Sequence, residues 1–237
     1  MCVKGFVFFL FCLIFFVFVF CFGWVGTAIA TFFYIAPVVP FLKLIKGEIS
    51  WKESPGVLLI CSFMNCILWS DYGLLQDKFL VYFANGLGGT ITLIFITIFL
   101  IHLADKKFCF AFLYTLCLIA VIVGLALLCY EVIKSDITGK IAMVFNVLMY
   151  AAPGEKIITV FRTGDVSLIP IWSTIGGTAC SSCWLIYGIY QNDLNLIIPN
   201  LLGVLASIVQ IVVYLIFRGK SINKNENQEQ ENNDNEE

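Results

Sequence analysis

The sequence predicts an all-α membrane protein with seven transmembrane helices, arranged as two parallel three-helix repeats joined by a linker helix. Composition, a series of long apolar stretches and an internal repeat carry this prediction. The chain has 237 residues, of which 60% are hydrophobic and 13% are charged, and its mean hydropathy is +0.95. A soluble domain must present a polar face to water, so this composition indicates a lipid environment. The near-neutral charge balance gives no reason to expect a nucleic-acid partner.

Residues 1–22 form a hydrophobic leader. Lys4 precedes an unbroken apolar run from Phe6 to Phe22. This is the pattern of a signal peptide, with cleavage near Cys21 or Gly23 that would leave the new N-terminus outside. Because the run is long for a signal peptide, an uncleaved additional helix is the alternative.

Seven further stretches meet the requirement of about 20 mostly apolar residues for a membrane-spanning helix. They are residues 23–45, 55–75, 80–102, 109–130, 141–162, 170–190 and 196–217. Such long and uniformly apolar runs exclude barrel strands and predict a helical bundle. The last residues, 218–237, are rich in Asn, Gln and Glu. They have too little apolar surface to fold, so we expect a disordered cytosolic tail.

Basic residues predict the orientation in the membrane. One set of helix ends carries Lys43, Lys46, Lys52, Lys106, Lys107, Lys156, Arg162, Arg218, Lys220 and Lys224, and the other carries Lys78, Lys134 and Lys140. The richer set predicts the cytosolic side, with the C-terminus in the cytosol and the first helix starting outside or in a lumen. We expect the plasma membrane, with an endomembrane as the alternative.

An internal repeat organises the chain. The matched segments, in order, are Tyr34-Ile35-Ala36-Pro37 with Tyr150-Ala151-Ala152-Pro153, Pro55 with Pro170, Trp69-Ser70-Asp71-Tyr72-Gly73 with Trp184-Leu185-Ile186-Tyr187-Gly188, Asp77 with Asp193, and Asn85-x-x-Gly88 with Asn200-x-x-Gly203. The match predicts repeats at 23–102 and 138–217. A linker helix at 109–130 returns the chain to the side from which a parallel repeat can begin. Such paired repeats commonly hold a substrate site near the middle of the membrane.

Four prolines occupy matched places near the cytosolic ends of their helices: Pro37, Pro55, Pro153 and Pro170. Proline removes an N–H donor and loosens or kinks a helix. The matched positions favour hinges that let the inner helix ends move. Ordinary kinks are the alternative.

Paired polar and aromatic residues outline a candidate binding site. The pairs are Asn85 with Asn200, Trp69 with Trp184, and Asn65 with Cys180, which lie one helical turn before the tryptophans. A carboxamide in lipid needs partners, and it offers donors and acceptors to hydroxyl groups, while flat aromatic faces suit the C–H faces of a pyranose. The alternative is an interfacial aromatic belt with hydrogen bonds between helices. We expect that second role for Gln210 and Tyr214.

Other chemistries have little support in the sequence. No acidic residue or histidine falls clearly at mid-membrane, which favours a passive facilitator over a proton-coupled carrier; Glu155 weakens this inference. Cys180 and Cys183 form a C-x-x-C without a second pair or a histidine cluster, so we expect no metal site. No nucleophile–base pair, metal spacing or phosphate loop supports an enzyme, and no cofactor is expected.

The motifs of the second repeat are similar to the second MtN3/saliva repeat of SWEET sugar transporters. They are Tyr150-Ala151-Ala152-Pro153, Pro170, Trp184-x-x-Tyr187-Gly188, Asp193, Pro199-Asn200-x-x-Gly203, Gln210 and Tyr214. The first repeat matches more loosely. In this family, in which parallel repeats are known, the resemblance implies a 3+1+3 carrier that lets sugars equilibrate by alternating access. It also implies homo-oligomers, for which trimers are described.

The resemblance further implies roles for individual positions. The four prolines would act as intracellular hinges, and the paired Asn and Trp positions would contact the sugar. Asn65 and Cys180 would tune size, and their moderate size favours a monosaccharide. Tyr72 and Asp193 would form an outer gate. The chain departs from the family pattern at Gly154-Glu155-Lys156, in the loop Thr163-Gly164-Asp165-Val166-Ser167 and in its long leader.

Two alternatives stay open at this point. A PQ-loop amino-acid exporter would carry Pro-Gln dipeptides, but here Pro37 and Pro153 are followed by Val38 and Gly154. A seven-helix receptor is the other alternative, and the internal repeat and short loops count against it.

Overall fold

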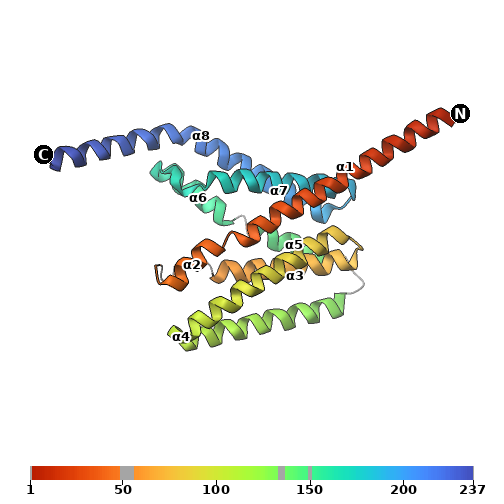
Figure 1. The fold of residues 1–237 in the computed structure, drawn as a ribbon, viewed down its shortest axis with the longest axis horizontal. Helices are drawn as coiled ribbons and strands as arrows, with labels where there is room; N and C mark the ends of the chain where they lie inside the picture. Colours follow the sequence, from red (N-terminus) through yellow and green to blue (C-terminus); the bar gives the residue numbers. More distant parts are fainter. Residues whose placement is uncertain (1, 49–55, 133–136, 149–150, 237) are drawn as a thin grey trace. The chain divides into compact units, whose positions relative to one another are not determined.

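The computed structural model describes residues 2–48, 56–132, 137–148 and 151–236, with side chains described for part of them, and these ranges are helical apart from short turns (Figure 1). The elements are α1 (Cys2–Ile35), α2 (Val38–Lys46), α3 (Gly56–Leu75), α4 (Phe79–Val132), α5 (Ile137–Leu148), α6 (Ala151–Thr163), the 3-10 helix η2 (Val166–Leu168), α7 (Ile171–Tyr190) and α8 (Leu194–Glu236). The all-α prediction is confirmed. The chain divides into two compact units, residues 1–145 and 146–237.

In the first unit, α1 and α2 run parallel to the first half of α4. Three contacts in the same order along both segments show this direction. The ring centroids of Trp24 and Phe83 lie 5.6 Å apart, Tyr34 reaches Asn85, and the centroids of Phe41 and Phe95 lie 5.2 Å apart. Parallel packing is expected of the first and third helices of a repeat, because the second helix in the sequence runs back in the opposite direction before the third begins.

The predicted third helix and linker helix are joined as one element, α4, which has 54 residues and folds back on itself (Figure 1). The rings of Phe99 and Tyr114 show the reversal, because their centroids are only 5.7 Å apart. In a straight helix, positions fifteen residues apart would be separated by about 22 Å. Both rings belong to the apolar core of this unit, which comprises Phe41, Leu44, Leu59, Phe63, Ile96, Phe99, Ala111 and Leu118 with Tyr114 packed against it.

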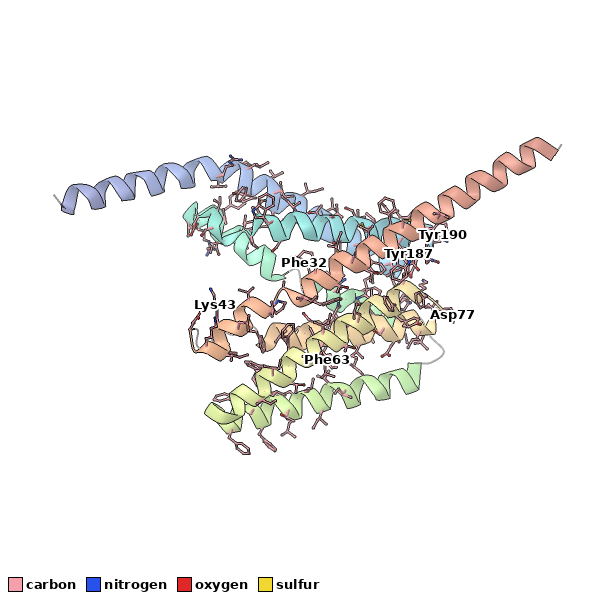
Figure 2. All side chains as sticks on the ribbon, viewed as in Figure 1. Phe32, Lys43, Phe63, Asp77, Tyr187 and Tyr190 are labelled. Atoms are coloured by element: carbon pink, nitrogen blue, oxygen red, sulfur yellow. The ribbon has the colours of Figure 1, made fainter. Side chains whose placement is uncertain are left out.

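The turn between the second and third helices of each repeat has the same backbone geometry. In the first repeat, the amide of Lys78 donates to the carbonyl of Gly73 (2.8 Å), and Asp77, which is labelled in Figure 2, has a φ of 53°. In the second repeat, the amide of Asp193 donates to the carbonyl of Gly188 (3.0 Å) and Asn192 has a φ of 49°. The two turns of the predicted internal repeat therefore share the same backbone hydrogen bond and the same left-handed residue.

This geometry corrects one predicted pair. The sequence match aligned Asp77 with Asp193, but Asp77 and Asn192 share the left-handed conformation, which Asp and Asn tolerate better than most residues. Lys78 is consequently the counterpart of Asp193. The two repeats thus carry opposite charges at equivalent positions.

In the second unit, α8 packs antiparallel to α7 and parallel to α6. The hydroxyl of Thr174 donates to Oε1 of Gln210 across the α7–α8 contact (3.4 Å), which confirms Gln210 as a residue that bonds between helices. The ring centroids of Phe161 and Phe217 lie 5.3 Å apart between α6 and α8. Tyr214 packs against a small apolar core instead, formed by Val160, Ile169 and Val213.

Within the described part of the chain, two helical segments are long and apolar enough to cross a membrane by length and composition, residues 79–101 and 194–219. Shorter apolar segments occur at residues 20–35, 59–75, 110–119 and 137–147. Beyond residue 219, α8 continues to Glu236, where we expected a disordered tail. The Asn-, Gln- and Glu-rich residues after Gly219 include no proline or glycine to end the helix.

Candidate functional site

In the first unit, Asn85 lies in the second turn of α4 and is half-buried. Its Nδ2 donates to the carbonyl of Val81, one turn earlier (2.8 Å). Its Oδ1 accepts from the hydroxyl of Tyr34 on α1 (3.4 Å). A carboxamide has two donor hydrogens and two acceptor lone pairs. The two hydrogen bonds described here leave one donor hydrogen and one acceptor lone pair. Together these match a hydroxyl group, which both donates and accepts.

Asn200 repeats this arrangement in the second unit. Its Nδ2 donates to the carbonyl of Leu196, again one turn earlier on the same helix (2.7 Å). Asn200 is half-buried and follows Pro199, which is buried inside α8. No hydrogen bond to its Oδ1 is found among the residues whose side chains are described. Each repeat therefore presents its carboxamide in the same conformation.

The two tryptophans also have matched surroundings. The ring of Trp69 meets that of Tyr72 edge to face, with centroids 5.6 Å apart and planes at 84°. Trp184 and Tyr187 meet at 5.6 Å and 85°, and Figure 2 shows Tyr187 near the end of α7. Trp69 is buried and Trp184 half-buried. In each repeat an edge-to-face partner thus fixes the orientation of the tryptophan ring.

Asn65 and Cys180 lie one turn before these tryptophans, on α3 and α7. Oδ1 of Asn65 is buried and has no hydrogen-bond partner in the described part of the chain. A buried acceptor without a partner is unfavourable by about 1–3 kcal/mol, so it is an observation that a polar ligand would explain. The thiol of Cys180 lies within hydrogen-bonding reach of the Trp184 side chain. This contact confirms that the two residues share a face of α7.

At the outer turns, the two repeats hold their tyrosines differently. Nζ of Lys78 donates to the Tyr72 hydroxyl (3.5 Å) and lies 5.2 Å from the centroid of that ring. Nε2 of Gln191 donates to the Tyr187 hydroxyl instead (3.1 Å). Asp193, predicted as the partner of Tyr72 in an outer gate, is buried, and its carboxylate accepts from the Asn195 amide at the start of α8 (3.0 Å).

Of the four matched prolines, the three that the structure describes lie at helix starts. Pro37 stands between α1 and α2, where the amide of Ala36 is the last to bond back into α1 and the amide of Phe41 bonds to the Pro37 carbonyl. Pro153 lies in the first turn of α6, and Pro170 directly precedes α7. A helix start needs no N–H from proline, so these positions separate helical segments. Pro55 lies outside the described residues.

Three residues that hold predicted site residues in place were not predicted from the sequence. Tyr34 was predicted only to be part of the internal repeat, and its hydrogen bond to Asn85 joins positions 51 residues apart. Lys78 and Gln191 were not singled out, although each holds an outer tyrosine. The spacing of Tyr187 and Gln191, one helical turn apart, was a usable signal for that pair. The separation of Tyr34 and Asn85 along the chain gave no signal that these two residues would meet.

Comparison with known proteins finds a matching family. Residues 20–108 and 136–221 match the MtN3/saliva family, described as "Sugar efflux transporter for intercellular exchange". The chain is similar to "Bidirectional sugar transporter SWEET1a" of Sorghum bicolor, with 32% identity over 210 residues that cover 84% of this chain and 77% of the relative. It is also similar to "Bidirectional sugar transporter SWEET1" of Arabidopsis thaliana, with 30% identity over 205 residues, 84% of this chain and 83% of the relative.

A solved structure shares the fold. "The 3.7 A resolution structure of a eukaryotic SWEET transporter" matches with a TM-score of 0.77 at 23% identity, covering 85% of this chain and 97% of that one. This likeness confirms the predicted fold with its two repeats.

Proposed function

Because this chain belongs to the SWEET (MtN3/saliva) family of sugar transporters, we propose that it is a passive, bidirectional uniporter for a monosaccharide, working by alternating access. Family membership makes it an integral membrane transporter and not an enzyme, as the sequence predicted. It also excludes the two alternative functions, an amino-acid exporter and a receptor. The passive mechanism, the kind of sugar and the residues that bind it are parts of the proposal.

The observation that carries the binding site is the matched conformation of Asn85 and Asn200. Each carboxamide donates one N–H to a carbonyl of its own helix, which restricts the rotation of the group. Each keeps a second N–H for a ligand. Sugars display hydroxyl groups that donate and accept, so two pre-oriented carboxamides suit them better than an apolar or ionic substrate.

Aromatic rings and a size-limiting pair complete the proposed site. Trp69 and Trp184 present rings that can cover the C–H face of a pyranose. Asn65 and Cys180, one turn before the tryptophans on the same helices, would limit the size of the sugar, and Oδ1 of Asn65, which has no partner among the described residues, supplies an additional acceptor. Their moderate side chains favour a monosaccharide over a disaccharide.

Gating is proposed at the two ends of the helices. Pro37, Pro55, Pro153 and Pro170 would be hinges of the inner gate, supported by the break between α1 and α2 at Pro37. Tyr72 and Asp193 would belong to an outer gate, supported by their places at the outer ends of α3 and α8. The exposed Lys43, Lys46 and Arg218 near the inner ends of α2 and α8 support a cytosolic C-terminus.

The placement of charge supports a passive mechanism. Asp71, Asp77 and Asp193 all lie at outer helix ends, and a coupled carrier needs a titratable group inside the span. Glu155 is the residue to examine if coupling is found. We further propose that the transporter acts in the plasma membrane or an endomembrane as a homo-oligomer, as the family resemblance implies.

The test is uptake of radiolabelled glucose by cells that lack their own hexose carriers. We expect saturable uptake that a proton uncoupler does not change and that Asn200→Ala abolishes. Thr178→Ala is the matched control, because its hydroxyl bonds to the Thr174 carbonyl within α7. Normal surface expression without uptake of glucose or other common sugars would refute the proposed substrate. Uptake lost on uncoupling would keep the sugar but refute the passive mechanism.

A further inference from the structure

We infer that Tyr34 is a positioning residue of the sugar site: it orients the Asn85 carboxamide and ties the helix break at Pro37 to that carboxamide. This inference rests on the proposed function and deepens it. Tyr34 lies in the last turn of α1, directly before the break, and both residues belong to the first unit.

The hydrogen bonds of Asn85 define what Tyr34 contributes. Without the Tyr34 hydroxyl, the Val81 carbonyl alone would hold the carboxamide through one N–H. The hydroxyl donates to Oδ1 (3.4 Å) and so fixes the opposite side of the group. With both contacts, the remaining N–H and the remaining lone pair point in set directions. A pre-oriented group binds its ligand more tightly, because less rotational freedom is lost on binding.

The surroundings of Tyr34 show that its ring is placed by the fold. The ring lies against α4 at Gly88, one turn after Asn85, where a Cβ would overlap ring atoms. The Cys66 thiol, from α3, lies within hydrogen-bonding reach of the Tyr34 and Thr92 side chains. Residues of α3 and α4 therefore converge on this tyrosine of α1. Only glycine at position 88 leaves room for an aromatic ring at this depth.

Both sides of the helix break are attached to α4. On the N-terminal side of the break, Tyr34 contacts α4 at Asn85 and Gly88. On the C-terminal side, Phe41 of α2 contacts Phe95 and Phe99, with ring centroids 5.2 and 6.2 Å apart. The contact on the N-terminal side includes the carboxamide that we propose binds sugar. Sugar on Asn85 thus acts on the same group that holds the last turn of α1.

The experiment measures glucose uptake and its inhibition by each monodeoxyglucose, for the wild-type chain and for Tyr34→Phe in carrier-deficient cells. In the wild type, one analogue should compete poorly, because it lacks the hydroxyl that Asn85 recognises. Tyr34→Phe should raise KM for glucose by about three- to tenfold, as expected for one neutral hydrogen bond, with little change in the maximal rate. Discrimination against that one analogue should shrink by a similar factor.

Matched variants separate this role from a structural one. Tyr114→Phe removes a hydroxyl from another half-buried tyrosine of the same unit and should leave KM unchanged. Gly88→Ala should reproduce the Tyr34→Phe pattern because it displaces the ring. Gly86→Ala should not, since its Cβ would meet only the Ser70 hydroxyl, at 4.0 Å.

Three results would overturn the inference. One is an unchanged KM and unchanged discrimination in Tyr34→Phe at normal surface expression. Another is a KM raised equally for glucose and every analogue, which would indicate a general structural role. If the wild type takes up no sugar at all, the proposed function fails and this inference fails with it, and that result is visible before any variant is compared.

Discussion

At the scale of single residues, glycine sets the closest approach of two helices in each repeat. A Cβ on Gly73 would lie 2.5 Å from the backbone nitrogen of Tyr82, and one on Gly188 would lie 3.0 Å from the Leu196 Cβ. Backbone cannot move aside as a flexible side chain can. The sequence showed both glycines as members of a repeat but not what they touch, because that depends on the crossing of α3 with α4 and of α7 with α8.

We expect Gly73→Ala to reduce the free energy of unfolding by about 1–3 kcal/mol, the usual effect of overpacking a tight contact. The matched control is Gly177→Ala on α7, where a Cβ meets nothing within 4 Å and alanine favours the helix. Thermal unfolding in detergent measures both. Equal melting temperatures for the two variants would contradict the close-packing interpretation.

The sequence predicted some of the paired residues and not others. The Asn and Trp pairs were found by spacing, and in the structure the members of each pair make the same hydrogen bond within their helix or the same edge-to-face ring contact. The pairing of Asp77 with Asp193 was wrong because residue type suggested it, whereas the backbone conformation aligns Asp77 with Asn192. The bond of Tyr34 to Asn85 could not be predicted, since helix rotation about its axis decides which side chains meet.

At the scale of elements, apolar length predicted the helices well. The stretch 170–190 agrees with α7, and 55–75 agrees with α3 to within one residue. Hydropathy does not report breaks inside an apolar run, so the stretch 23–45 contains the end of α1, a turn and all of α2 except its last residue. Conversely, the reversal within α4 was predicted, because charged residues separate its two apolar halves.

We expect Pro37→Ala to join α1 and α2. The new N–H can donate to the Phe33 carbonyl, so the helix continues through the former turn. If the break is a hinge, the maximal transport rate should fall by roughly tenfold, equal to about 1.4 kcal/mol on the barrier. The melting temperature should rise because a helix break is removed.

Initial uptake rates and thermal unfolding of the purified protein test this together. Wild-type uptake in a variant with a higher melting temperature would show that the break is an ordinary feature of helix packing. A lower melting temperature would mean that the turn, and not the continuous helix, is the stable form.

At the scale of the whole molecule, the length of α1 bears on how the chain is processed. Its 34 residues would extend for about 51 Å, while the hydrocarbon core of a bilayer is about 30 Å thick. A continuous α1 would therefore carry an apolar leader into water on the outer side. Removal of residues 1–22 resolves this conflict.

We accordingly expect the mature protein to begin near residue 22. Mass spectrometry of the N-terminal peptide from membranes of a eukaryotic host tests this. Recovery of a peptide that starts at Met1 in the transporting protein would contradict cleavage. It would mean instead that the leader forms a separate helix in the membrane.

The central place of the third helix in each unit has a consequence for biosynthesis. In the first unit α1 and α3 both pack mainly on α4, and in the second unit α6 and α7 both pack on α8. A ribosome therefore delivers two helices of each bundle before the partner that joins them exists. Until α8 leaves the translocon, α6 and α7 lack the helix on which both pack within the second unit. A premature stop directly before Leu194 would leave 193 of the 237 residues. The second bundle would nevertheless lack the helix on which α6 and α7 pack, and we expect quality control to degrade the product.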